Sequence, residues 1–288
     1  MAFIQMDFES QYLGCRNPIS ILLPDIPRPA DPRKFYSENK RFKVLWLLHG
    51  TFGDNLDWLR RSKIEVYACE KNLAVVMPSG LNADYVNWKR FGIGYNMYDY
   101  LFEELMPMIY NWFPISDLRE DNYIAGLSMG GYGTMVYALN HPEKFAVAAS
   151  LSAPLQDGRN PEPIRSYPPN LATPPHLTAY RPDRRENQIL NAGGLENYLR
   201  SPANTWDKLI ENYKNGVRMP ELYFCCGTKD FLYPAFQKFR KFTQEQGYTD
   251  IVFEEEEGYA HEWRFWDMYI EKILNRYLPL EKQEGLSF

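Results

Sequence analysis

The chain has 288 residues, of which 45% are hydrophobic; this is enough to bury one large core, and α/β domains of this length are commonly single. Its 32 basic and 37 acidic residues give a net charge of −5 at pH 7, and no basic block is long enough to follow a phosphate backbone. These figures argue against nucleic acid as a partner and leave a small-molecule substrate open.

The N-terminal segment predicts strands rather than a targeting signal. Residues 1–7 alternate apolar and polar side chains and lack a basic n-region and a continuous apolar stretch, so no secretion signal is expected. Residues 2–13 and 17–23 predict two alternating strands joined by a turn at 14–16, a hairpin at the edge of a sheet. No run approaches the length of a membrane span. We therefore expect a cytoplasmic protein that makes no membrane contact.

The interior of the chain alternates between two patterns. Short, nearly continuous apolar runs predict strands covered by helices on both faces, at residues 44–48, 73–77, 123–125, 145–151 and 222–226. Apolar residues at helical spacing predict helices at 63–71, 98–112, 131–140, 234–246 and 262–277. This alternation indicates an α/β fold with a mostly parallel sheet and right-handed crossovers.

One long connection, residues 153–217, carries no predicted strand. Prolines on this scale prevent regular structure. They stand at Pro154, Pro161, Pro163, Pro168, Pro169, Pro174, Pro175 and Pro182. We expect a cap-like insertion over the site in a single domain, with one or two short helices at 195–213; a disordered surface loop is the alternative.

A serine between glycines carries the first chemical signal. Gly126, Leu127, Ser128, Met129 and Gly130 follow the apolar strand 123–125, the pattern of a nucleophile elbow. In such an elbow a strand turns sharply into a helix, and only glycines fit on either side of the strained serine. Ser128 is therefore the predicted nucleophile.

A serine nucleophile needs an imidazole base and a carboxylate that orients it. His261 lies in a loop between the predicted strand 251–254 and the last helix, where it can reach a central elbow. Asp230 follows the end of the buried strand 222–226, and the order Ser128, Asp230, His261 is that of α/β-hydrolases.

The other candidates for these roles have simpler interpretations. His49 is expected to organise the loop after strand 44–48, and His141 to cap the C-terminus of the elbow helix. His176, in the insertion, is expected to be exposed, with substrate contact as the alternative. Asp99 is expected at a helix N-terminus and Asp157 in a loop.

Acyl transfer also needs two backbone donors for the oxyanion. One is the residue after the nucleophile, Met129, and the other lies in a glycine-containing loop after an early strand. Such a loop begins with His49, Gly50 and Thr51. We therefore expect the amide of Thr51 to be the second oxyanion donor, with that of Phe52 as the alternative.

Four segments together resemble the esterase D and tributyrin esterase group, which is related to carbohydrate esterase family 1. The resemblance extends over nearly the whole chain, and two of its segments are specific signals. The segments are the His-Gly loop that ends at Asp57 and Trp58, the elbow at 126–131, and the specific stretches 226–233 and 260–267.

This resemblance implies an α/β-hydrolase fold and a serine carboxylesterase with Ser128, Asp230 and His261 as its triad. The implied substrates are short acyl esters, or acetyl or feruloyl esters of plant polysaccharide fragments. One alternative is a thioesterase such as an S-formylglutathione hydrolase, although the longer pattern expected of that group is not found. The other is a catalytically silent binding protein on the same fold.

The surroundings of the predicted site are less clearly marked. Trp58, Trp88 and Trp263 lie close in sequence to site loops and are candidate substrate contacts, with core packing as the alternative. No cofactor is expected, and no metal, because the histidines are scattered and the four cysteines have no zinc spacing. Free thiols fit a reducing cytosol. A homo-oligomer, formed through the edge strand or the cap, stays open.

Overall fold

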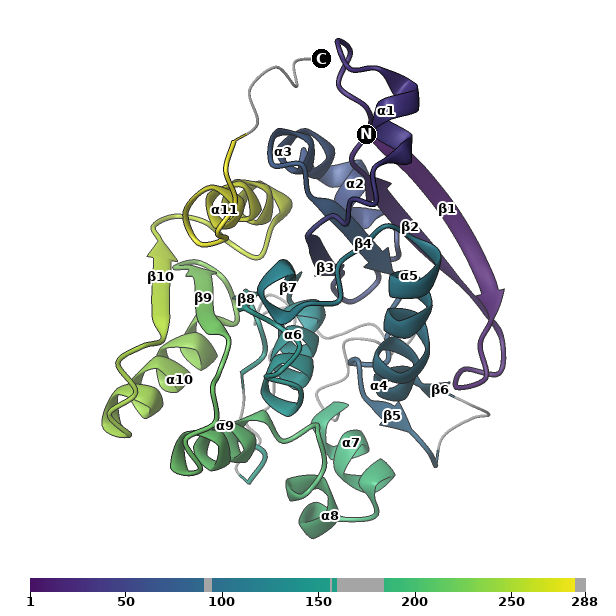
Figure 1. Cartoon of the computed structure of the whole chain (residues 1–288). Helices are drawn as coiled ribbons and strands as arrows, with labels where there is room; N and C mark the ends of the chain where they lie inside the picture. The colour runs from purple at the N-terminus through teal and green to yellow at the C-terminus, as the bar shows by residue number, and fades with distance from the viewer. Residues whose placement is uncertain (91–94, 156, 160–183, 283–288) are drawn as a thin grey trace.

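The computed structural model describes residues 1–90, 95–155, 157–159 and 184–282. Its centre is an eight-stranded sheet in the order β1-β2-β4-β3-β7-β8-β9-β10 (Figure 1). The six strands from β4 to β10 in this order are parallel to one another. Strand β2 is antiparallel to both of its neighbours, β1 and β4. The strands are β1 (Ala2–Glu9), β2 (Arg16–Leu23), β3 (Val44–Leu48), β4 (Ala74–Pro78), β7 (Asn122–Leu127), β8 (Val147–Leu151), β9 (Glu221–Gly227) and β10 (Val252–Glu256).

The predicted α/β fold with a mostly parallel sheet is confirmed, and so is the hairpin at its edge. The hairpin turn is longer than expected, because the buried Ser10 ends β1 early. Its hydroxyl accepts from the amide of Leu13 at 3.0 Å and donates to Glu104 at 2.5 Å. A side chain that satisfies the local backbone in this way competes with the strand ladder.

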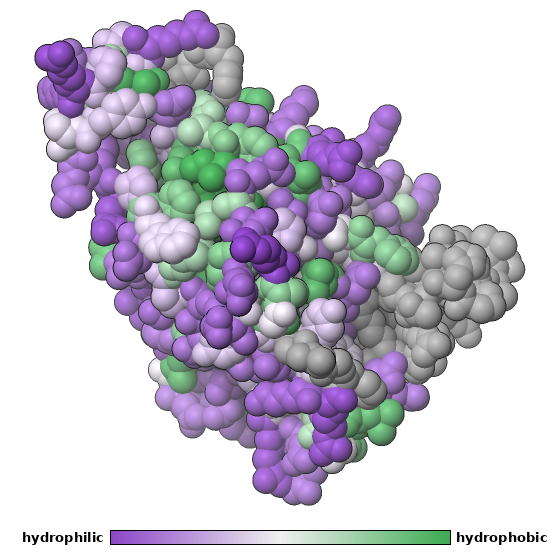
Figure 2. Space-filling model, turned by 90° about the vertical axis from the view of Figure 1, so that its right-hand side faces the viewer, coloured by the Kyte–Doolittle hydropathy of each residue, from purple (hydrophilic) through white to green (hydrophobic). Residues whose placement is uncertain are grey.

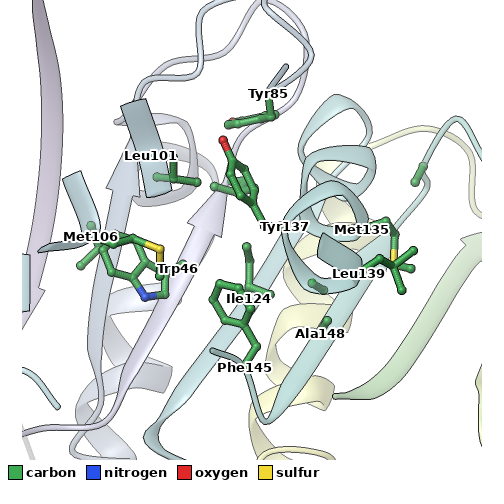
Figure 3. Packing of buried hydrophobic residues seen from close by; sticks show 14 of the residues in the cluster. Trp46, Tyr85, Leu101, Met106, Ile124, Met135, Tyr137, Leu139, Phe145 and Ala148 are labelled. Atoms are coloured by element: carbon green, nitrogen blue, oxygen red, sulfur yellow. The ribbon is translucent and has the colours of Figure 1, made fainter. Parts of the chain in front are cut away.

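Helices cover both faces of the sheet (Figure 1). Helices α3 (Ile64–Glu70) and α11 (Trp263–Arg276) pack on one face. The opposite face carries α5 (Met106–Trp112), α6 (Met129–Asn140) and α10 (Tyr233–Glu245). Figure 3 shows part of this second layer, where Tyr137 of α6 and Ile124 of β7 lie in one buried cluster.

The predicted helix 98–112 is divided into three parts. A short α4 (Met97–Asp99) leads into a π-helical stretch, η1 (Tyr100–Leu105), and then into α5. Pro107 has no backbone N–H, and its ring would clash with the carbonyl four residues earlier in a regular α-helix, so the wider register precedes it.

Several small elements were not predicted because their apolar pattern is too short to show a period. They are α1 (Pro32–Ser37), α2 (Asp57–Arg61), the pair β5 (Asn87–Trp88) and β6 (Tyr95–Asn96), and the 3₁₀ turn η2 (Arg119–Asp121).

The long connection between β8 and β9 has no strand among its described residues. Helices α8 (Leu195–Leu199) and α9 (Thr205–Lys214) lie where short helices were expected. A further helix, α7 (Arg184–Ala192), precedes them and was not predicted. The proline-rich stretch from 160 to 183, with His176, lies outside the described residues.

Candidate active site

The serine stands at a sharp turn between β7 and α6. Ser128 has φ 52° and ψ −118°, a backbone conformation that side-chain-bearing residues rarely adopt. A Cβ on Gly126 would lie 2.4 Å from the carbonyl oxygen of Gly130, and a Cβ on Gly130 would lie 2.4 Å from that of Leu48. Backbone atoms cannot give way as a flexible side chain can, so both glycines are required for the turn.

Three side chains from separate loops meet at this turn. His261 Nε2 is 3.0 Å from Ser128 Oγ, and His261 Nδ1 is 2.8 Å from Asp230 Oδ2. The Asp230 side chain is fully buried, and its other oxygen accepts from the amide of Leu232 at 2.8 Å. A buried carboxylate acts as an acceptor here, so Nδ1 carries the donated proton and Nε2 faces the serine hydroxyl as an acceptor.

The loops that carry His261 and Asp230 are joined to each other by a hydrogen bond. The amide of Lys229 donates to the carbonyl of Tyr259 at 2.9 Å, which joins the turn after β9 to the loop after β10. The imidazole of His261 also lies between two rings, Phe231 at 4.6 Å and Trp266 at 4.8 Å between centroids. These contacts fix the position of the imidazole over the elbow.

The oxyanion candidates all border the same pocket as Ser128. The amide of Phe52 donates to Asn82 Oδ1 at 2.9 Å, and Phe52 has φ 65° with its ring 54% exposed. That bond directs the Phe52 amide to Asn82.

His49 lies beneath this loop and has the organising position expected of it. Its Nε2 accepts from the amide of Gly80 at 2.7 Å, so Nδ1 donates to the carbonyl of Gly50, also at 2.7 Å. Burial lowers the pKa of His49 to about 4. The imidazole is therefore neutral at pH 7 and joins the end of β3 to the turn after β4.

The remaining histidine and acid candidates lie elsewhere in the described structure. His141 is the C-cap residue of α6, and its Nε2 is 2.6 Å from Tyr98 Oη while its ring stacks on Phe102. Asp99 belongs to α4, and Asp157 accepts from the amide of Arg159. None of them borders the pocket at Ser128.

The pocket has a volume of about 480 Å³, and its lining includes Ser128 and His261 together with Arg185 and Gln188 of α7. Only Trp263 of the three tryptophan candidates lines it. Trp58 is buried beneath Trp263, with ring centroids 5.2 Å apart, and donates to the Leu48 carbonyl. Trp88 donates to the carbonyl of Ala83 and packs in the core. Trp58 and Trp88 do not border this pocket, and both show the core packing that was the alternative to substrate contact.

Several lining residues were not predicted. Tyr132 follows Ser128 by one helical turn and Phe231 directly follows Asp230, so proximity to the predicted triad was a usable signal for both. Arg185 and Gln188 come from α7, and nothing in the sequence around them indicates burial.

In the described ranges, no group of three or more histidine, cysteine, aspartate or glutamate side chains could hold a metal ion. Within the same ranges, no helix has the length and apolar character needed to cross a membrane.

The sequence is similar to those of known esterases. The family model described as "Putative esterase" matches residues 10–274. An acetyl esterase from Caldicellulosiruptor saccharolyticus is 30% identical over 275 residues, which are 94% of this chain and 96% of the relative.

Solved structures agree in fold. The S-formylglutathione hydrolase from Staphylococcus aureus superposes with a TM-score of 0.74 at 28% identity, covering 95% of this chain and 97% of that one. A ferulic acid esterase superposes with a TM-score of 0.69 over 95% and 96% of the two chains, and at 20% identity it shows the shared fold alone. With the family model spanning most of its length, the chain belongs to the putative esterase family and is a carboxylic ester hydrolase of the serine type.

Proposed function

We propose that Ser128 is the nucleophile of this esterase, with His261 as general base and acid and Asp230 as the carboxylate that orients His261. The observation that carries the proposal is the unbroken series of contacts from Ser128 Oγ through both nitrogens of His261 to the buried Asp230. A hydroxyl is a weak nucleophile by itself, and this series supplies the base and its orientation.

The reaction follows from the positions of these groups. Ser128 Oγ attacks the ester carbonyl carbon while its proton moves to His261 Nε2, and the carbonyl oxygen becomes an oxyanion held by the amides of Met129 and Thr51. The alcohol leaves as His261 returns the proton to it. Water then attacks the acyl-enzyme, losing a proton to His261, which passes it to Ser128 as the carboxylic acid departs. Each oxyanion donor contributes about 3 kcal/mol to the transition state.

The proposed substrates are small acyl esters, with acetyl and feruloyl esters of plant polysaccharide fragments as the finer class. Support comes from the acetyl esterase relative and from a pocket whose volume accommodates a small acyl group and part of its alcohol. The similarity to an S-formylglutathione hydrolase supports a thioester as the second candidate.

A panel of matched acyl groups separates these candidates. The enzyme is tested on p-nitrophenyl acetate, butyrate and octanoate, methyl ferulate, acetylated xylan and S-formylglutathione, beside Ser128→Ala. We expect Ser128→Ala to lower kcat by roughly a million-fold with an unchanged melting temperature. Preference for one substrate class assigns the acyl and leaving groups. Silence of the wild type on every member would instead favour the catalytically silent binding protein.

The compartment and the oligomeric state are also proposals. A cytoplasmic location is supported by four free cysteines, two of them buried. A homo-oligomer formed through β1 is supported by its place at the sheet edge and by Phe3, which is 48% exposed. Figure 2 shows the side of the molecule that carries β1, where apolar side chains gather among polar ones. Sedimentation of the wild type beside Phe3→Lys tests this interface.

A further inference from the structure

We propose that Arg185 is a carboxylate-binding residue of the active-site pocket, so that the natural substrate carries a negatively charged group besides its scissile bond. This inference rests on the proposed function, since it concerns the substrate of the same pocket. Arg185 lies at the start of α7, is only 7% exposed, and lines the pocket that contains Ser128.

The hydrogen bonds of the Arg185 guanidinium all leave from one nitrogen. Nη1 donates to Tyr198 Oη at 2.8 Å, to Tyr132 Oη at 3.2 Å, and to Gln188 Oε1. The buried Nε–H has no acceptor in the described structure, and no hydrogen bond is made there by Nη2. Nε and Nη2 form the side-on edge of a guanidinium, which matches the two oxygens of a carboxylate.

Among the described residues, the guanidinium of Arg185 donates its hydrogen bonds to neutral groups, and the buried Asp84 acts on it electrostatically from farther away. Its three hydrogen-bond acceptors are two phenols and an amide, and its Cζ lies 4.9 Å from the centre of the Tyr132 ring. Gln188 accepts from Arg185 and donates to Asp84 Oδ2 at 2.7 Å, so an amide stands between the guanidinium and that carboxylate. A buried cation without a bound anion is costly, and a substrate carboxylate would offset that cost.

Two other acidic residues of the pocket have partners of their own. Asp57 lies 3.6 Å from Arg61 on the same helix, and Glu262 accepts from the amide of Ala260 at 3.1 Å. Among the described lining residues, Arg185 is therefore the buried cation whose Nε–H has no acceptor, whereas the side chain of Arg61 is exposed.

The position of Arg185 suits a group on the substrate rather than the reacting carbonyl. Tyr132 stands one turn along α6 from Ser128, donates to the carbonyl of Ala203 at 2.6 Å, and accepts from Arg185 at its hydroxyl. The guanidinium is thus held at the hydroxyl end of the Tyr132 side chain, which projects from α6. Asn191 fastens α7 to the body of the fold by donating to the carbonyl of Asn87 at 2.7 Å.

The test uses two pairs of esters that differ only in charge. In the first pair the alcohol carries the group: 4-acetoxyphenylacetate against 4-acetoxyphenylacetamide. In the second the acyl part carries it: phenyl hydrogen adipate against phenyl adipamate. A hydrogen-bonded ion pair predicts that kcat/KM of the wild type favours the carboxylate in one pair by about 10- to 100-fold, and the pair that responds places the carboxylate.

Substitution identifies the residue responsible. Arg185→Gln should abolish that preference, whereas Arg200→Gln, which removes the same charge from an exposed position on the same insertion, should keep it. Because a preference is a ratio within one protein, a partial loss of folded enzyme does not change it. A wild type without preference in either pair, or an Arg185→Gln enzyme that retains it, would overturn the inference.

Two further measurements keep the test decisive. If Arg185→Gln does not fold, inhibition of the wild type by 4-hydroxyphenylacetate and by adipate is compared with that by their amides; an equal effect of acid and amide in both cases counts against the inference. Hydrolysis of p-nitrophenyl acetate, and its loss in Ser128→Ala, reports separately on the proposed function.

Discussion

Two polar networks border the same pocket and differ in how fully they are satisfied. In the triad, both oxygens of Asp230 and both nitrogens of His261 have partners within the fold. In the Arg185 cluster, Nη1 is saturated while the buried Nε–H has no acceptor among the described residues. A network that is complete before substrate arrives is preorganised for the chemical step, and one that is incomplete is suited to selecting a ligand.

The two networks also come from different parts of the chain. Loops after strands of the central sheet carry the proposed triad, whereas the connection between β8 and β9 supplies Arg185 and Gln188. Changes to the triad should therefore affect every substrate alike, and changes to the cluster should affect substrates selectively.

Asp230→Asn should lower kcat by about 10⁴-fold for all active esters in the panel. The amide can donate to His261 and so favours the wrong tautomer. Asp157→Asn, at an acid outside the pocket, is the control and should stay within about twofold of the wild type. A loss confined to one ester would contradict the division between the networks.

Gly126 at the elbow should tolerate a side chain less well than a glycine with open space around it. Gly126→Ala should destabilise the fold by about 3 kcal/mol in urea denaturation, because its Cβ would meet the backbone of Gly130. Gly216→Ala has open space around its Cβ and only its φ of +63° to oppose it, so about 1 kcal/mol is expected. Equal losses would mean that close packing does not select Gly126.

The neutral His49 under the oxyanion loop predicts a dependence of stability on pH. Its pKa of about 4 lies below the ordinary 6.5, so between these values the unfolded chain takes up a proton that the folded chain does not. The free energy of unfolding should therefore fall as the pH drops from about 6.5 to about 4, by roughly 3 kcal/mol from this residue.

Chemical denaturation of the wild type and of His49→Asn at pH 7 and pH 4 measures this contribution. The wild type should lose about 3 kcal/mol more than the variant over that interval, since the variant lacks the titrating group. Parallel losses in both proteins would show that His49 does not supply this dependence.

The sequence was informative where a pattern has one physical meaning. The apolar run 44–48 coincides with β3, because a continuous apolar segment of that length fits a strand buried on both faces. The elbow was recognisable because its backbone strain and close contacts select glycine at fixed spacing. The geometry that brings Asp230 and His261 to Ser128 agrees with the chain order expected of an α/β-hydrolase.

The remaining features depend on contacts that no local pattern encodes. A tryptophan near a site loop can point either way, and Trp58 turns beneath Trp263 because its N–H finds the Leu48 carbonyl. Helix α7 is mostly polar, which predicts an exposed helix; Arg185 is buried only because Tyr132 and Tyr198 surround it. Such burial follows from tertiary packing alone.

Formation of a covalent intermediate on Ser128 can be tested by labelling the enzyme with a fluorophosphonate and mapping the adduct by peptide mass spectrometry. The proposed mechanism predicts one adduct per chain, on Ser128, with loss of p-nitrophenyl acetate hydrolysis in proportion to labelling, slow labelling of Asp230→Asn, and none of Ser128→Ala. An adduct on another residue that tracks the loss of activity, or full activity with Ser128 labelled, would contradict it.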